Sequence, residues 1–335
     1  MIFRVLGKEE VSELTEKLRG GFPGSAKIYY VLKNFLRGTM EGFEVIVDAW
    51  PEWQCVILRP GNQEAVPGYF RHYYICYAKS VTSLKFFLQR PGVVDWDKPA
   101  TFTGVPYDIL PVIQEVSKKR GGQLPYIEPR FMYCWSTDPP EIPKIPEGVK
   151  LTTLKPEHAT RLRQDWNNVR GGKDLDNYFR KVIENFDSSA LINAKGELLA
   201  YICMQFNGSM AMLHVHSDHR GNGYGEIILK SMTHKLASKG EIPYGFVPST
   251  DLLGIQKAQY FGYTWVPQGN MVWIRYIPKP KIDYSKTGSV ESREKLNASH
   301  EEEETHMFIN AIPLAVNDKP KTPMNNYFTT AVNSS

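Results

Sequence analysis

The sequence has few of the residues and segments that mark whole classes of protein. Its 335 residues include only four cysteines, Cys55, Cys76, Cys134 and Cys203, and no two of them stand at the short spacing of a metal site. We therefore expect reduced, mostly buried thiols and no metal. No apolar run approaches the roughly 18 residues of a membrane-spanning helix, so no membrane span is expected.

Neither positive nor negative residues are in large excess. The net charge of +4 is spread along the chain. This balance is too weak to indicate nucleic acid as a partner, although it is compatible with a small anionic ligand. Glutamates recur in a helical pattern over residues 9–16, unlike a signal peptide or an acid-free transit peptide, so this segment predicts the first helix of the fold.

The composition divides the chain into two halves and a tail. Four prolines within residues 138–148 predict an extended linker. We expect an N-terminal domain over 1–137 and a second domain over 149–278. The polar, partly acidic composition of residues 279–335 predicts a disordered tail.

Hydrophobic periodicity predicts strands and helices in both halves. In the first half we expect helices over 8–19 and 81–89, and strands over 26–32, 44–50, 55–58 and 72–78. In the second half we expect helices over 157–166, 175–185, 223–239 and 252–261, and strands over 189–192, 198–205, 211–216, 244–247 and 271–276. This mixture indicates an α/β protein whose mixed sheets are flanked by helices.

Residues 220–225, Arg-Gly-Asn-Gly-Tyr-Gly, carry the clearest chemical signal. They lie between a predicted strand that ends near His216 and a predicted helix that begins near Gly223. The first amides of a helix have no partner within it, and glycines let a bulky anion approach the backbone closely. This turn therefore predicts a pyrophosphate site.

The spacing decides between the known pyrophosphate motifs. The order Gly221-x-Gly223-x-Gly225 departs from the dinucleotide fingerprint, and no Gly-Lys-Ser/Thr follows as a Walker loop requires. The pattern Arg-x-x-Gly-x-Gly resembles the pyrophosphate loop of the GNAT acetyltransferase superfamily. More closely, the chain resembles the glycine N-acyltransferase family over about residues 1–278. The similar segments are 22–29, 47–51, 72–74, Trp166, 171–172 and 215–223.

The resemblance implies a fold and a reaction. It implies two GNAT-like halves, with acyl-CoA bound as co-substrate by the second half and no metal. The residues it places at acyl-CoA are Val215, His216, Arg220, Gly221, Asn222, Gly223, Tyr224 and Gly225. It further implies transfer of the acyl group to the amino group of glycine or a related amino acid by direct attack on the thioester. The family alone implies a mitochondrial location, with the cytoplasm or another place inside the cell as the alternative, and we expect a monomer.

The attacking amine needs a proton acceptor. The family's base is a carboxylate two residues before the motif arginine, which here is Asp218, where the family usually has glutamate. His216 and His219 are alternatives, because an unperturbed histidine has a more suitable pKa. Metal binding by His214, His216 and Asp218 is conceivable, although nothing in this chemistry needs it.

Other parts of the site stay open. The position that holds a tyrosine acid in many GNAT enzymes is Ala258, so we expect no tyrosine acid; Tyr260 is nearby but on another side of the predicted helix. The amino-acid carboxylate needs a cationic partner, and the candidates are Arg161, Arg163, Arg170 and Arg275. Two other functions compete: N-acetyltransfer to a protein lysine or a polyamine, and CoA binding with weak catalysis.

Overall fold

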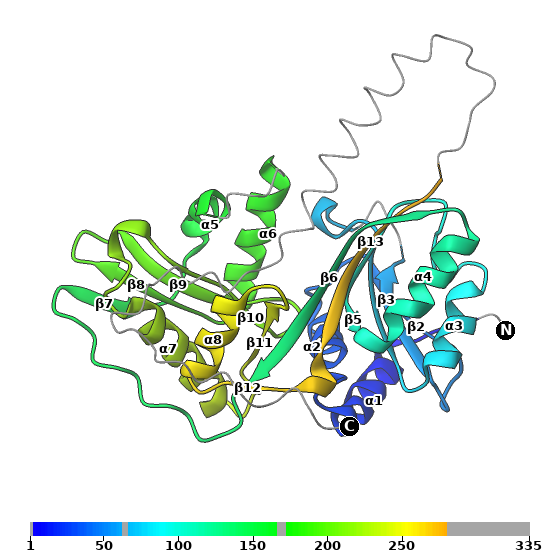
Figure 1. Ribbon diagram of the computed structural model, residues 1–335, viewed down its shortest axis with the longest axis horizontal. Coiled ribbons are helices and arrows are strands. Elements are labelled where there is room, and N and C mark those ends of the chain that lie inside the picture. The colour runs from blue at the N-terminus through cyan, green and yellow to red at the C-terminus, as the bar shows by residue number, and fades with distance from the viewer. Residues whose placement is uncertain (1–2, 62–65, 166–171, 280–335) are drawn as a thin grey trace, which may run out of the picture.

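The computed structural model describes residues 3–61, 66–165 and 172–279. Two halves lie side by side in it (Figure 1). Within the described residues, no helix combines the length and apolar character needed to cross a membrane. The tail predicted for 279–335 falls outside the described residues from position 280 onward.

The first half contributes six strands and four helices in chain order. The strands are β1 (Arg4–Val5), β2 (Phe43–Val47), β3 (Cys55–Pro60), β4 (Tyr73–Ala78), β5 (Ala100–Pro106) and β6 (Gln123–Cys134). The helices are α1 (Lys8–Leu18), α2 (Ala26–Leu36), α3 (Val81–Gln89) and α4 (Leu110–Lys119). The predictions over 8–19, 44–50, 55–58, 72–78 and 81–89 are confirmed in type, whereas β5, α4 and β6 were not predicted.

The second half contributes seven strands and four helices. The strands are β7 (Val149–Thr152), β8 (Ser188–Asn193), β9 (Leu198–Met204), β10 (Met210–Val215), β11 (Tyr244–Pro248), β12 (Thr264–Trp265) and β13 (Met271–Ile277). The helices are α5 (Ala159–Asp165), α6 (Gly172–Asn185), α7 (Tyr224–Ser238) and α8 (Leu252–Tyr260). Every helix and strand predicted for this half is present in the structure, with its ends shifted by a few residues.

The strand predicted over residues 26–32 is wrong, because this segment belongs to helix α2. No residue of this run is exposed, since the helix is buried on nearly every side. Ala26, Ile28, Tyr30 and Leu32 are all buried, and so is Lys27. A short, continuous apolar run fits a buried strand and a buried helix equally well, and here tertiary packing decides for the helix.

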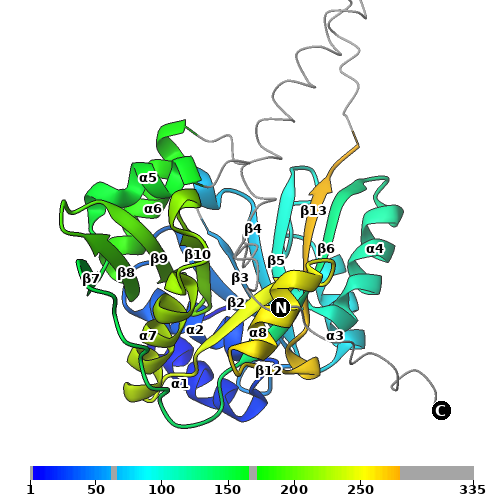
Figure 2. The same cartoon turned by 60° about the vertical axis from the view of Figure 1, so that its left-hand side comes forward.

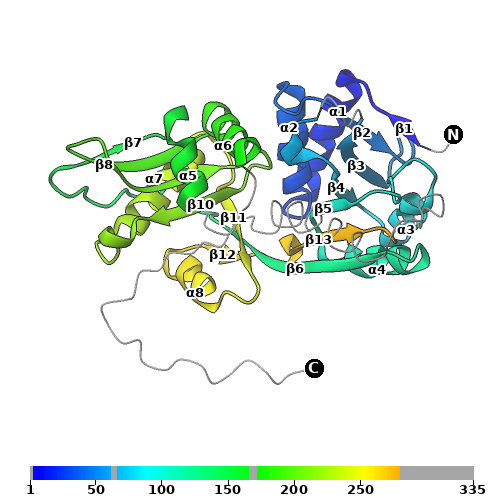
Figure 3. The ribbon, with the colours of Figure 1, turned by 90° about the horizontal axis from the view of Figure 1, so that it is seen from above.

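Two sheets organise the molecule, and one of them crosses between the halves. The larger sheet has the order β1-β2-β3-β4-β5-β13-β6-β11, with β12 pairing to β6, and the smaller has the order β10-β9-β8-β7. The pair β4–β5 is parallel, while the other pairs are antiparallel. Strand β13, late in the chain, therefore lies between β5 and β6 of the first half (Figure 3).

Helices cover both sheets and divide the core into three clusters. Helices α3 and α4 pack on one face of the larger sheet (Figure 2), while α7 packs against β8, β9 and β10 of the smaller sheet and α8 packs against β11 and β12. The largest cluster joins α1, α2 and α6 to strands of both sheets. The four cysteines are buried and free, as expected, and burial raises the pKa of the Cys134 thiol to about 12.

Close contacts fix one half against the other. Gly208, with φ of +81°, lies directly under the Tyr30 ring, where a Cβ would come within 2.4 Å of the ring. The Asn34 amide donates to the Phe206 carbonyl at 2.6 Å, and the Tyr30 hydroxyl accepts from the Ile242 amide at 3.1 Å. Packing and hydrogen bonds thereby hold helix α2 against the second half.

Candidate active site

The turn between β10 and α7 has the backbone geometry that an anion site requires. Gly221 has φ of +81° and Gly223, the N-cap of α7, has φ of +77°. No atom lies within 4 Å of the position of an added Cβ at either glycine. The turn is therefore open to an approaching ligand, and the first amides of a 15-residue helix lie beside it.

Side chains of the same turn brace it from within. Arg220 Nε donates to the Val215 carbonyl at 3.2 Å, and Asn222 Nδ2 donates to the His219 carbonyl at 3.1 Å. The His219 ring stacks on the Tyr224 ring at 6.2 Å between centroids, and Tyr224 is buried. These contacts hold the turn in one shape.

Asp218, the predicted base, lies at the surface. Its side chain is 78% exposed, and its Oδ1 accepts a hydrogen bond from Ser217 Oγ at 3.0 Å. Its Oδ2 lies 3.8 Å from His216 Nδ1. The structure thus brings Asp218 and His216 together at the end of β10, with the carboxylate open to solvent.

His214 lies apart from that pair, in a second cluster that the sequence did not predict. Its Nε2 is 3.7 Å from Asp165 Oδ2 at the end of α5, and its ring stacks on Tyr201 of β9 at 5.4 Å. The Tyr201 hydroxyl donates to Asp165 Oδ2 at 3.3 Å, and Arg161 Nε donates to the same carboxylate at 3.0 Å. Asp165 is thereby held by three neighbours.

Burial is the main cause of the pKa shifts of His214 and Tyr201 in this second cluster. The pKa of His214 is lowered chiefly by burial, and Arg220, Arg161 and His216 lower it further, whereas Asp165 raises it. Burial likewise raises the pKa of the Tyr201 hydroxyl, with Asp165 adding to the effect. At neutral pH, His214 is therefore an uncharged imidazole and Tyr201 a hydrogen-bond donor.

The strand that carries His214 is irregular just before it. The pairing of β10 with β9 shifts register between Ala211 and His214, and Met212 has φ of +57°. Such a bulge turns backbone groups and the next side chain away from the regular pleat. His214 therefore follows a break in the strand, next to Val215.

Three of the four arginines proposed to bind a substrate carboxylate lie in the described residues, and each already contacts another side chain. Arg161 pairs with Asp165, and Arg163 pairs with Asp176 at 2.7 Å. Arg275 is buried and donates to Thr101 Oγ1 at 2.7 Å. Arg170 lies outside the described residues. Among the described parts of the chain, no three His, Cys, Asp or Glu side chains converge as a metal ion would require.

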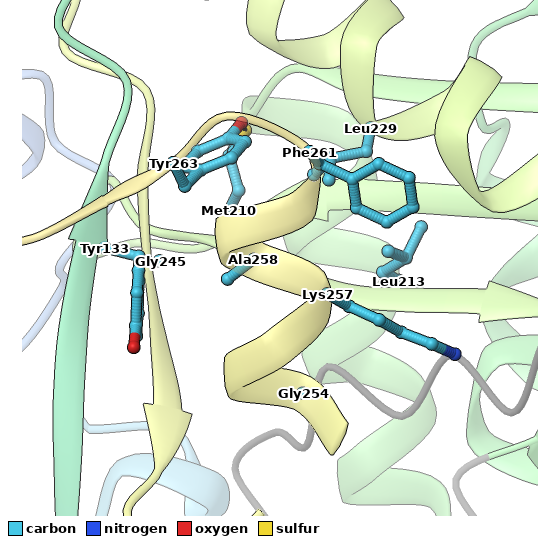
Figure 4. Close-up of a pocket in the computed structure, with 10 residues that line it drawn as sticks. All are labelled: Tyr133, Met210, Leu213, Leu229, Gly245, Gly254, Lys257, Ala258, Phe261 and Tyr263. Carbon is cyan, nitrogen blue, oxygen red and sulfur yellow. Dashed lines mark hydrogen bonds between the residues drawn. The ribbon is translucent and has the colours of Figure 1, made fainter. Parts of the chain in front are cut away.

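An apolar pocket opens between β10 and β11, where the two sheets part. The strands touch at their beginnings, because the Met210 carbonyl lies 3.1 Å from the position of a Cβ on Gly245, and β11 then pairs with β6 instead of β10. Helices α7 and α8 close the pocket (Figure 4). Its lining is Tyr133, Met210, Leu213, Leu229, Gly245, Gly254, Lys257, Ala258, Phe261 and Tyr263.

Ala258 and Tyr260 occupy different environments on α8. Ala258 is buried and lines the pocket, whereas Tyr260 is 69% exposed. Tyr133 and Tyr263 also line the pocket, and the Tyr263 hydroxyl is hydrogen-bonded to Thr233. The pocket is therefore lined mainly by apolar side chains.

Comparison with known proteins assigns the family. The model of the aralkyl acyl-CoA:amino acid N-acyltransferases matches residues 2–187, more than half of the chain. The chain belongs to this family. It is thus an acyl-CoA:amino acid N-acyltransferase, as the resemblance implied. A second model, of FR47-like proteins, matches residues 190–255, which include the glycine turn.

The alignment with this chain spans nearly the whole length of several characterised relatives. Bovine glycine N-acyltransferase is 20% identical over 81% of this chain and 98% of its own. Bovine glycine N-phenylacetyltransferase is 21% identical over the same shares. Human glycine N-acyltransferase-like protein 2 is 22% identical over 82% of this chain and 97% of its own.

A solved structure shows the same fold. The X-ray structure of a Drosophila protein superposes with a TM-score of 0.69 at 18% identity, over 83% of this chain and 99% of that one. The predicted α/β class, with mixed sheets flanked by helices, is confirmed.

Proposed function

We propose that this enzyme transfers an acyl group from acyl-CoA to the amino group of glycine or a closely related amino acid. Relatives named for glycine as acceptor match four-fifths of the chain, which supports glycine as the first acceptor to test. The single observation that carries acyl-CoA binding is the open glycine turn at the N-terminus of α7.

The two parts of this site fit two parts of coenzyme A. Val215, His216 and residues 220–225 would hold the pyrophosphate, because the amides at the start of α7 and the positive end of its dipole favour an anion. The apolar pocket between β10 and β11 would take the pantetheine chain. The thioester would then lie near the end of β10, where a strand amide can polarise its oxygen.

The chemistry is a direct attack that forms a C–N bond and breaks the C–S bond. The amino nitrogen adds to the thioester carbon, and the CoA thiolate leaves as the bond to sulfur breaks. We propose that Asp218 accepts a proton from the amino group. The exposed carboxylate, 78% accessible, can pass this proton to water.

Thiol release from acyl-CoA tests the proposal. We expect free CoA from benzoyl-CoA or acetyl-CoA in the presence of glycine, and kcat/KM lower by about 10²-fold in Asp218→Ala. A lysine peptide and a polyamine serve as alternative acceptors. Release at only the uncatalysed rate with every amino acid tested would contradict the proposal, and release with the lysine peptide alone would favour N-acetyltransfer to protein.

The remaining parts of the proposal concern the oligomeric state and the cellular location of the enzyme. We propose that the enzyme acts as a monomer and in mitochondria, as the family resemblance implies. The domain boundary at 138–148 also stays a prediction. Gel filtration with light scattering and cell fractionation test the first two.

A further inference from the structure

The second cluster at β10 has no role in the mechanism described so far. It comprises His214, Asp165, Tyr201 and Arg161, which come from β10, α5, β9 and α5 respectively. The side chain of His214 is 23% exposed and that of Asp165 12%. The cluster is thus shielded from bulk water, although a small molecule can still reach the imidazole.

The proposed reaction releases two protons from the amino nitrogen, at two different stages. A free amino acid enters as an ammonium ion, which must lose one proton before its nitrogen has a lone pair to attack with. When the C–N bond has formed, the same nitrogen carries a further proton that must leave as the C–S bond breaks. The sum is one amide, one thiolate and two protons, of which one leaves before the attack and the other during it.

The two protons leave in different surroundings. The first proton can be lost at the entrance, next to water, where the exposed Asp218 lies. The second leaves during the chemical step, inside a site from which water must be excluded. His214 meets this second requirement, because it directly precedes Val215 at the end of β10 and is mostly shielded.

We propose that His214, oriented by Asp165, takes the proton of the attacking nitrogen as the C–N bond forms and the C–S bond breaks. The inference rests on the proposed acyl transfer and adds a residue to it. Asp165 faces Nε2 and favours the tautomer with its proton there, so Nδ1 keeps the lone pair that accepts the proton. Asp165 also stabilises the imidazolium that results.

The charged and titratable groups around His214 support this role. They are Asp165 and Arg161 of α5, Tyr201 of β9, His216 of β10 and Arg220 of the turn. Burial outweighs Asp165, so the pKa of His214 is lowered and the ring is neutral at the start of the reaction. Asp165 is a positioning residue here, because it acts through the imidazole.

The test compares His214→Gln with Asp218→Asn over pH 6 to 10, measuring CoA release with glycine as acceptor. High pH supplies the free amine, so we expect it to restore much of the activity of Asp218→Asn. It cannot replace an acceptor inside the site. We therefore expect kcat of His214→Gln to stay about 10²-fold or more below wild type at every pH, with an unchanged KM for acyl-CoA.

Two further variants separate orientation from structure. Asp165→Asn removes the charge that raises the pKa of His214, so the acid limb of kcat/KM should move to lower pH, which loss of packing alone would not cause. Tyr201→Phe keeps the stacking and loses one hydrogen bond to Asp165, and should reduce kcat by at most about tenfold. Unfolding midpoints and CoA binding verify that each variant folds.

The outcomes distinguish the two proposals. If wild type releases no CoA with any amino acid, the proposed function fails, and the role of His214 fails with it. If wild type is active and His214→Gln retains its kcat and pH profile, only the inference about His214 is overturned. An unmoved acid limb in Asp165→Asn would overturn it as well.

Discussion

The ammonium of Lys27, on α2, lies 4.8 Å from the centroid of the Trp273 ring on β13. The Arg130 guanidinium, on β6, lies at the same 4.8 Å from that ring. All three side chains are at most 5% exposed, and Lys27 also donates to the Thr103 carbonyl. Two buried cations thus share one indole at the centre of the larger sheet.

Lys27 should make stability depend on pH. Burial lowers its pKa well below the usual range, with Arg130 adding to the effect, so the unfolded chain binds more protons between the lowered pKa and about 10.4. The free energy of unfolding should therefore rise with pH across this window, by up to about 1.4 kcal/mol per pH unit. Lys27→Met should lack this slope in urea unfolding.

Lys17→Met is the matched control for that experiment. Lys17 lies on α1 with its side chain 43% exposed, so its removal should leave the slope of wild type unchanged. Equal slopes in wild type and Lys27→Met would contradict the prediction.

Strand β13 should couple the stability of the two halves. Ile274 is fully buried, and it pairs with Phe102 of β5 and Ile127 of β6. Ile274→Ala should lower the free energy of unfolding by about 2–5 kcal/mol. Hydrogen exchange should show faster opening of β2 and of β9 together. Leu252→Ala, at a side chain 70% exposed, should change neither. Unchanged protection of β9 would indicate that the halves unfold separately.

The glycine turn allows a comparison within one helix. Gly223 and Gly240 flank α7 with φ of +77° and +70°, and neither has an atom within 4 Å of an added Cβ. Alanine should cost about 1–2 kcal/mol of stability at either position, because both need left-handed backbone. Only Gly223→Ala should raise the KM for acyl-CoA, by about tenfold. Equal KM values in steady-state assays would argue against the turn as the CoA site.

Filling the apolar pocket should weaken CoA binding without unfolding the protein. Ala258→Leu places a larger side chain among Leu213, Leu229 and Phe261. In wild type, CoA at 100 times its Kd should stabilise the fold by about 2.7 kcal/mol, and this gain should fall in the variant. Tyr260→Leu, on the exposed side of α8, should respond to CoA as wild type does. A full response in Ala258→Leu would place CoA elsewhere.

The parts of the fold that the sequence predicted are those with local signals. The helix over 223–239 has glycines at its ends and an apolar face, and α7 begins and ends within one residue of the prediction. Over residues 26–32 of helix α2 every side chain is buried, so this short stretch has no exposed face that would distinguish it from a buried strand. The position of β13 between β5 and β6 depends on pairing between residues far apart in the chain, which no local pattern encodes.

The candidate site likewise has one part that a local sequence pattern predicted and one part that depends on contacts between distant segments. The turn at 220–225 is a continuous segment, so its glycines could be recognised before the structure was known. The pairing of His214 with Asp165 joins β10 to α5 and arises only when the chain folds. His214 itself could have been suspected from its alternation with His216, whereas nothing near Asp165 in the sequence indicates a role.

The place of β13 also bears on how the protein is made. During synthesis the first half emerges from the ribosome well before residues 271–277 leave the exit tunnel, and domains generally fold as they emerge. This first half must wait with β5 and β6 unjoined until almost the last described residue is synthesised. A newly made chain therefore exposes the β13-facing edges of β5 and β6 until residues 271–277 emerge, and unpaired edges of this kind can pair with another chain.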